Sequence, residues 1–318
     1  MGWATSRPWK RPRGCWRSPT IDSMTTTDYP ALFGASDKAS IRAQAAYFRI
    51  LWAHLFSLVL AGITAKIASA VDPSSYRVLA NTTAVILAVG LLLMWVLRAK
   101  RYEKVWFDGR AVAESVKTAT WRYMMQAPPY DRDEDEAHVD TGFLKDLGDI
   151  RGARPGVDAH LAGLVSGATQ ISDRMRRTRV LPLEERKKIY LRDRLVDQKT
   201  WYDGKARANR SSASAWFWTV AGLQVVALCL AIVQSDAPFL SIDPVPIIMA
   251  LAAAFLAWTQ AKRHDELTQS YSLAAQELSS LEALAPHVSD PKRFQAFVTQ
   301  VEGAVSREHT LWMARRNI

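Results

Sequence analysis

The residue types that most often carry out catalysis or bind metals occur along this chain without the spacing that such chemistry needs. Neither CxxC nor any Cys/His metal-ligand set occurs, and the sequence contains no HExxH, P-loop or GxGxxG motif. We therefore expect no enzymatic activity, no cofactor and no metal. The residues without metal-ligand spacing are the cysteines Cys15 and Cys229 and the histidines His54, His138, His160, His264, His287 and His309.

One charged residue lies within an apolar segment. Lys66 follows Ile50 by sixteen positions, about 24 Å at the rise of an α-helix, which places it in the outer half of a bilayer. Two interpretations stay open: the favoured one has the ammonium snorkelling to the outer headgroups, and the other has it facing a water-filled pore or a polar partner. No opposite intramembrane charge accompanies it, so Lys66 is expected to stand alone.

Charges on a first helix are spaced so that they can pair along one face. Arg110 and Glu114 are four residues apart, Glu114 and Lys117 are three apart, and Trp121 follows as a packing anchor. A solvated row of salt bridges, weak in stability terms, is the favoured interpretation. Docking between helices, coupling polar helices to the membrane, is the alternative.

A second cluster lies within about two and a half turns of another helix. It contains no nucleophile beside a base, so helix packing, within or between subunits, is favoured over catalysis. Its members are Asp197, Gln198, Trp201, Tyr202 and Lys205.

Four long apolar segments must hold these residues in place. The length of each segment is close to the roughly 20 residues that a helix needs to cross a bilayer. They predict an all-α membrane protein with two transmembrane hairpins and long cytoplasmic helical extensions. The predicted spans are Ile50–Val71, Leu79–Leu97, Ala215–Val233 and Ile242–Gln260.

The distribution of charge predicts the orientation. All but two of the 41 Lys and Arg residues, Lys66 and Arg77, lie outside the four spans and their two short loops. The positive-inside rule then places both termini and the long middle segment in the cytoplasm. The spans are expected to lie in the inner (plasma) membrane. A cytoplasmic face that lies against anionic lipid explains the net charge of +10, so no nucleic-acid partner is expected. Tryptophans at the cytoplasmic ends agree with this orientation as interfacial anchors: Trp52, Trp95, Trp216, Trp218 and Trp258.

The layout repeats. A shift of about 163 residues carries both spans of the first pair onto the second, and Glu114 onto Glu277. The sequence predicts two units, residues 29–182 and 183–318, preceded by a leader at residues 1–28. We expect translation of the protein to start at Met24, within this leader. The first expected polar helix, Arg98–Met125, is ended by two prolines and followed by an acidic loop. A second runs from Leu183 into the third span. Two more are expected after the fourth span, at Lys262–Ala285 and Pro291–Arg315.

Four stretches resemble one protein family. RAVAESVKTATWRYM (110–124), YLRDRLVDQKTWYDGKARAN (190–209), FVTQVEGAVSREHTLW (297–312) and YPALFGASDKASIRAQAAYF (29–48) are similar to SLATT-domain proteins. These are bacterial two-transmembrane effector domains associated with nucleotide-signalling (SMODS) and SLOG modules. The resemblance covers the chain from about Tyr29 and suggests two units in tandem.

The resemblance implies a function in the membrane. It suggests an oligomeric pore-forming or membrane-perturbing effector of a conflict system such as antiphage defence, triggered by a separate nucleotide-sensing or SLOG-type partner. The alternative is a non-conducting membrane adaptor that binds partners through its cytoplasmic helices. A dye that reports membrane potential separates the two.

Overall fold

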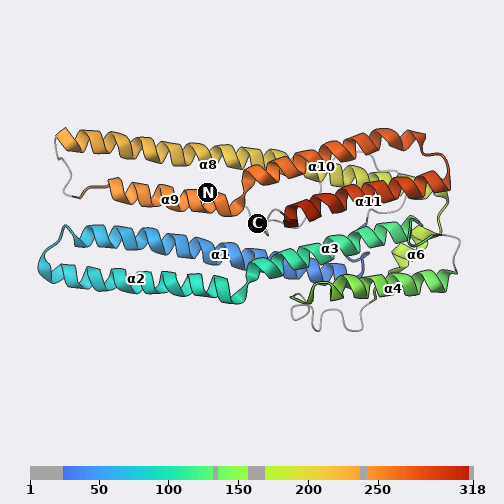
Figure 1. The fold of residues 1–318 in the computed structure, drawn as a ribbon, viewed down its shortest axis with the longest axis horizontal. Coiled ribbons are helices and arrows are strands. Elements are labelled where there is room, and N and C mark those ends of the chain that lie inside the picture. The colour runs from blue at the N-terminus through green and yellow to red at the C-terminus, as the bar shows by residue number, and fades with distance from the viewer. Residues whose placement is uncertain (1–23, 132–134, 157–168, 237–241, 315–318) are drawn as a thin grey trace.

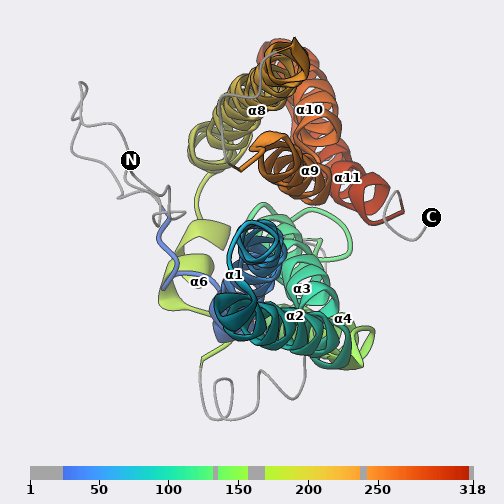
Figure 2. The ribbon, with the colours of Figure 1, turned by 90° about the vertical axis from the view of Figure 1, so that its left-hand side faces the viewer.

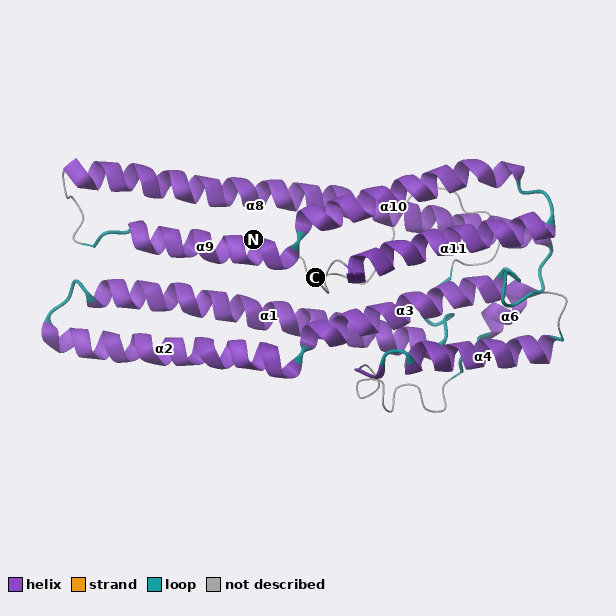
Figure 3. Ribbon diagram, in the orientation of Figure 1, coloured by secondary structure: helices purple, strands orange, loops and turns teal. Residues whose placement is uncertain are grey.

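A computed structural model of the chain describes residues 24–131, 135–156, 169–236 and 242–314. Every regular element in these ranges is a helix, as the sequence predicts (Figures 1 and 3). The predicted leader lies outside the described residues except for positions 24–28, and the prediction that Met24 is the true start is not tested.

The first hairpin is built from α1 (Ala31–Ala68) and α2 (Pro73–Lys100). The Asp72 carboxylate accepts hydrogen bonds from the backbone amides of Ser74 and Ser75, and Pro73 occupies the first helical position, so the sequence caps α2 locally. The helix α1 ends three residues before the predicted end of the first span.

The second hairpin follows the same plan. Helix α7 (Leu183–Tyr190) and the π-helical segment η1 (Leu191–Val196) continue without interruption into α8 (Asp197–Asp236), as predicted from Leu183 onward. Its partner α9 (Val245–Lys262) begins three residues after the predicted start of the fourth span. Pro244 and Pro246 explain the later start, because proline lacks the amide hydrogen that a helix interior requires.

A single left-handed arginine separates each second span from the polar helix that follows it. Arg101 (φ 46°) lies between α2 and α3 (Tyr102–Met124), and Arg263 (φ 51°) lies between α9 and α10 (His264–Leu284). The expected continuous helix from Arg98 is therefore wrong. Both arginines end an Ala-Lys-Arg tripeptide, and they are 162 residues apart, one fewer than the repeat expected from the spans.

The remaining elements complete the polar half of the molecule (Figure 1). Helix α4 (Glu136–Gly152) and helix α6 (Asp173–Arg179) pack against α3, and η2 (Ala285–His287) leads from α10 to α11 (Pro291–Ala314). The predicted acidic loop, residues 131–136, overlaps α4 only at Glu136, and the sequence analysis predicted no helix in this region. Val139, Phe143 and Leu147, four residues apart, nevertheless give α4 an apolar face that is buried.

The apolar half is a row of four helices. Helix α9 packs on both α8 and α1, and α1 packs on α2, which gives the order α8–α9–α1–α2 seen end-on (Figure 2). Close approach depends on small residues: a Cβ on Gly62 of α1 would lie 4.0 Å from Ala250 of α9, and one on Gly90 of α2 would lie 2.8 Å from the Ser57 hydroxyl.

All four helices of the row are long and apolar enough to cross a membrane, and their apolar windows are almost entirely unburied by protein. The large buried core lies instead in the polar half, under α3, α7, α10 and α11. A helix that is apolar on all sides yet uncovered by protein is stable in lipid. The chain is a multi-pass all-α membrane protein.

The left-handed hinge generates a prediction. A β-branched residue is strained at positive φ, so Arg101→Ile should lower the free energy of unfolding in mixed micelles by about 1–2 kcal/mol. Arg101→Gly should cause no loss, since glycine accepts this conformation. Arg98→Ile, one turn earlier on the exposed side of α2, is the matched control. Equal losses from both isoleucine variants would show that the hinge carries no conformational constraint.

Candidate functional site

A buried ion pair lies at the centre of the polar half. The guanidinium of Arg194, in η1, donates to both carboxylate oxygens of Glu302, in α11, at 2.9 Å and 2.6 Å. Arg194 is 1% exposed and Glu302 is 0% exposed. A charge so far from water is tolerated only when an opposite charge and further hydrogen bonds replace its hydration.

Those further hydrogen bonds come from both halves of the chain. The Tyr190 hydroxyl, just before η1, donates to Glu302 at 3.0 Å. The Thr118 hydroxyl of α3 donates to the other carboxylate oxygen at 2.9 Å and lies 3.4 Å from Arg194. Gln198 lies 3.5 Å from the guanidinium. We call Arg194, Glu302, Tyr190, Thr118 and Gln198 the buried network; through Thr118 it joins the first unit to the second.

The π-helical turn explains why one carboxylate can be reached by residues at positions 190, 194 and 198. Residues four apart on an α-helix drift around its axis, whereas a π-turn contains more residues per turn and keeps them closer to alignment. Tyr190, Arg194 and Gln198 therefore face α11 together. Such local widening of a helix is frequent at functional sites.

The electrostatics of the network favour a fixed charge state. Burial opposes the charge on Arg194, but the attraction and hydrogen bonds of Glu302 outweigh burial, so the pKa of the guanidinium lies above its usual range. Burial, reinforced by Glu302, raises the pKa of Tyr190 well above its usual value. Tyr190 is therefore a neutral hydrogen-bond donor, and Arg194 remains a cation throughout the physiological range.

Two further buried arginines secure the end of α3. Arg179 donates to the carbonyl oxygens of Tyr123 (2.7 Å) and Tyr130 (3.0 Å), and Arg186 donates to that of Met125 at 2.6 Å. The carbonyls at the C-terminal end of a helix have no partner within it and attract cations. Arg186 belongs to α7, so this contact ties α7 to the end of α3.

The predicted charge pair on α3 is present and partly buried, with the side chain of Arg110 34% exposed. Arg110 and Glu114 are 2.8 Å apart, and the side chain of Glu114 is only 15% exposed. The Arg110 guanidinium lies 5.8 Å from the ring centre of Trp201 in α8. Burial lowers the pKa of Lys117, and nearby Glu114 opposes that shift. Trp121, fully buried, donates to the Tyr29 hydroxyl and packs edge-on against the ring of Tyr190.

The predicted cluster at the start of α8 faces the same interface. Gln198 belongs to the buried network, and Asp197 contributes to the electrostatic field at Lys117. Trp201 and Tyr202 pack against Tyr271 of α10, and Lys205 lies 5.7 Å from the Trp201 ring centre. The structure thus brings both predicted clusters together where the two units meet.

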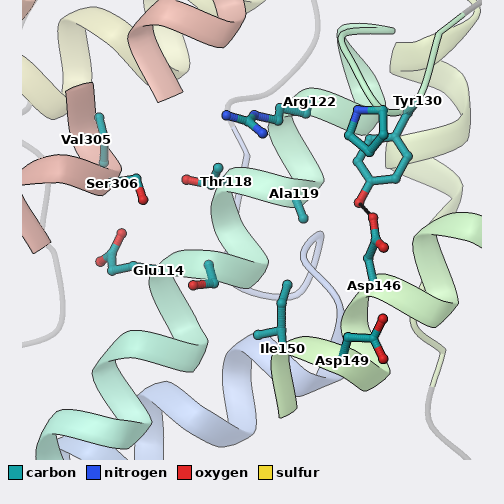
Figure 4. Close-up of a pocket in the computed structure, with 12 residues that line it drawn as sticks. Glu114, Thr118, Ala119, Arg122, Tyr130, Asp146, Asp149, Ile150, Val305 and Ser306 are labelled. Carbon is teal, nitrogen blue, oxygen red and sulfur yellow. Dashed lines mark hydrogen bonds between the residues drawn. The ribbon is translucent and has the colours of Figure 1, made fainter. Parts of the chain in front are cut away.

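An open cavity of about 370 Å³ adjoins the buried network between α3, α4 and α11 (Figure 4). Thr118 lines it and also bonds Glu302, so the cavity reaches the network directly. Its wall carries Arg122 on one side and, on the other, Asp146, which accepts a hydrogen bond from the Tyr130 hydroxyl at 2.6 Å.

Lys66 does not stand alone. Its ammonium lies 3.9 Å from the carboxylate of Asp243, which comes just before α9. The sequence prediction missed this pair because the partners are far apart in the chain and belong to different hairpins. Asp243 also accepts a hydrogen bond from the backbone amide of Val245, the first residue of α9. The pair connects the two hairpins at the end remote from the polar half.

The predicted anchor tryptophans fall into two groups. Trp52, Trp95 and Trp218 are exposed on the outside of the helices, at 42%, 63% and 68%. Trp216 packs against Phe255, and Trp258 packs against Phe48 of the first hairpin with ring centres 5.6 Å apart. These two stabilise contacts between helices.

An aromatic collar joins the units where the apolar half meets the polar half. Phe48 of α1 packs edge-on against Trp106 of α3 as well as Trp258 of α9. The Lys262 ammonium lies 3.4 Å from the centre of the Phe48 ring and 4.8 Å from that of Trp258, a cation–π arrangement. Phe48, Trp106, Trp258 and Lys262 make up the collar.

Within the described residues, no group of three or more His, Cys, Asp and Glu side chains could hold a metal ion. Sequence reasoning missed Arg194, Glu302, Tyr190, Arg179 and Arg186. The position of Arg194 among apolar residues of a helix could have indicated a buried charge. The sequence could not indicate its partner, Glu302, because that contact depends on the tertiary fold.

Family models match nearly the whole described chain. Residues 30–187 match SMODS and SLOG-associating 2TM effector domain 3, and residues 190–312 match SMODS and SLOG-associating 2TM effector domain 1. The chain belongs to the SLATT family. No curated protein and no solved structure matches it. The two SLATT units correspond to different domain types, which agrees with their slight identity, and the buried network lies between them.

The ion pair of this tandem SLATT protein gives a stability prediction. Glu302→Ala strands a buried guanidinium and should lower the free energy of unfolding in mixed micelles by about 3–5 kcal/mol. The double variant Arg194→Leu/Glu302→Leu should lose less, because no charge stays unpaired. Arg207→Ala, which breaks the exposed pair with Asp203 on α8, should cost about 0–1 kcal/mol. A Glu302→Ala loss equal to that of Arg207→Ala would contradict the prediction.

A second prediction concerns pH at the α9–α10 hinge. His264 lies 2.8 Å from the amide oxygen of Asn209 in α8, and burial, aided by Lys262, lowers its pKa. A histidine with a lowered pKa stabilises the fold above the unfolded pKa of about 6.5 and loses that contribution as the pH falls below it. Amide exchange at the start of α10, corrected for its intrinsic pH dependence, should therefore accelerate between pH 7.5 and 5.5. His264→Gln should abolish the acceleration; an identical response in that variant would assign the effect to another group.

Proposed function

We propose that this SLATT protein is a membrane effector of a bacterial conflict system that permeabilises the membrane as an oligomer. The observation that carries the proposal is that both halves of the chain match two-transmembrane effector domains. The four-helix row supports it, because a single layer of spans encloses no channel and needs further copies to do so. The proposed action is on the lipid bilayer, without enzymatic catalysis and without nucleic acid.

The proposed orientation places the polar half and both termini in the cytoplasm, with the spans in the inner membrane. The concentration of Lys and Arg outside the spans supports it. In this orientation the Lys66–Asp243 pair lies toward the outer surface and the aromatic collar lies at the cytoplasmic boundary. A cytoplasmic partner that senses a signal would then have access to α4, α6, α11 and the cavity.

The polar half is proposed to restrain the membrane half. The buried network and the collar both join the first unit to the second, on the polar side of the spans. Rearranging the spans into a pore requires the units to move, and these contacts oppose that motion. An activating partner would weaken them, and the cavity beside Thr118 offers a direct route to the network.

The test removes the inter-unit hydrogen bonds of one hydroxyl, to Glu302 and from Arg194, without removing either charged partner. Thr118→Val keeps the shape of the side chain and leaves the Arg194–Glu302 pair intact, but deletes the hydroxyl that reaches Glu302 from α3. Induced in bacteria carrying a membrane-potential dye, this variant should depolarise cells and stop growth at a protein level where the wild type does neither.

Thr141→Val on the exposed face of α4 is the matched control, since its hydroxyl bonds only within its own helix. It should behave as the wild type does. If Thr118→Val reaches the membrane at normal levels and leaves the potential unchanged, the restraint model is wrong. If, in addition, no form of the protein depolarises cells, the result favours a non-conducting adaptor that binds partners through its polar helices.

A further inference from the structure

A glutamine is exposed at the middle of a membrane span. Gln224 lies nine residues from either end of the third predicted span, and its side chain is exposed on the surface of α8. It forms no hydrogen bond to any part of the chain that the structure describes. The side chains around it on the same face are apolar: Phe217, Leu228 and Ala231.

The position leaves this amide without water. Nine residues of helix span about 13 Å, much more than the length of a glutamine side chain, so the amide cannot reach either headgroup layer. A primary amide carries two hydrogen-bond donors and one acceptor, and exposing it unpaired to hydrocarbon is costly. Polar side chains within the bilayer are accordingly satisfied across helix–helix contacts.

The rest of the protomer does not supply the partner. Helix α8 is at one end of the row, and its contact with α9 runs along the side that carries Ala227, which is 3% exposed, and Trp216, which meets Phe255 (Figure 2). Gln224 lies three residues before Ala227, about 60° round the helix, so its exposed side chain borders the α9 contact. Helix α9 offers it only apolar side chains from Ile247 to Trp258. The partner of Gln224 must therefore come from outside the protomer.

A second copy of α8 fits the site better than the opposite edge of the row. In a two-fold arrangement about an axis normal to the membrane, Gln224 meets the same residue at the same depth, and two primary amides can exchange N–H···O=C bonds reciprocally. Helix α2, at the other edge, offers only apolar side chains at mid-depth, from Ala84 to Val89. A head-to-tail contact between α8 and α2 would leave the amide unpaired.

We propose that two copies of this chain associate through their α8 helices, with Gln224 paired to Gln224 at the centre of the contact. The proposal deepens the proposed function, on which it rests, by specifying one contact of the assembly. The face consists of Phe217, Gln224, Leu228 and Ala231, which recur at helical spacing along one side of α8. Cys229, exposed and rotated away from this face, lies outside the contact.

Cysteine cross-linking in native membranes tests the contact. In a full-length Cys15→Ser/Cys229→Ser background, Leu228→Cys should form disulfide-linked dimers on mild oxidation. Val226→Cys, equally apolar and exposed but on the opposite side of α8, should not. Adding Gln224→Leu to Leu228→Cys should reduce the cross-linked fraction by about tenfold, the effect of losing a pair of interhelical hydrogen bonds. Gln224→Asn should retain the dimer.

The outcomes separate this contact from the proposed function. Equal cross-linking at positions 226 and 228, or no change on Gln224→Leu, would overturn the contact. Cross-linking is scored without reference to depolarisation, so dimers that form in cells whose potential never changes would support the contact and reject the effector. Depolarisation by Thr118→Val that survives Gln224→Leu, with no dimer at position 228, would support the effector and reject the contact.

Discussion

The rest of the polar half depends on the burial of one arginine against one glutamate. A pair excluded from water in this way is stable only while both partners and their additional hydrogen bonds are in place. Arg194 and Glu302 therefore hold the π-turn, α11 and, through Thr118, α3 in a single arrangement. Replacing a buried ion pair with apolar residues often changes the stability of the fold little. The contribution of this pair is therefore to specify how the two units fit together. Disturbing either partner would remove that specificity.

The same two units are connected again where the helices enter the apolar half. Arg101 and Arg263 break each unit at the equivalent point, so the second span of each hairpin and the polar helix that follows it are separate elements joined by one residue. The first spans differ, because α1 and the continuous helix from α7 through α8 extend from the polar half into the apolar half without a break. The collar of Phe48, Trp106, Trp258 and Lys262 lies beside these breaks. A change in the packing of the polar helices would thus reach the spans through the continuous helices α1 and α8 as well as through the hinge residues and the collar.

The sequence was sufficient for features that depend on local chemistry. Apolar segment length gave four spans, and proline positions and helical spacing gave most helix ends. It was insufficient where conformation or partners are set by tertiary contact. Arginine is not a residue type that favours positive φ, so a continuous helix was expected at Arg101. Lys66 and Asp243, 177 residues apart, gave no local sign of pairing, and the acidic segment before α4 concealed the apolar face of Val139, Phe143 and Leu147.

In the proposed restraint, α11 must remain docked on α3 for the membrane half to stay closed. Ser115 of α3 and Ser306 of α11 line the same cavity, so Ser115→Cys/Ser306→Cys in a Cys15→Ser/Cys229→Ser, Thr118→Val protein can be joined by a cleavable cross-linker. Ion leakage from liposomes containing that protein is the most direct measurement. The restraint account predicts sealed liposomes while the cross-link is intact and leakage once it is cleaved. Equal leakage before and after cleavage would contradict it.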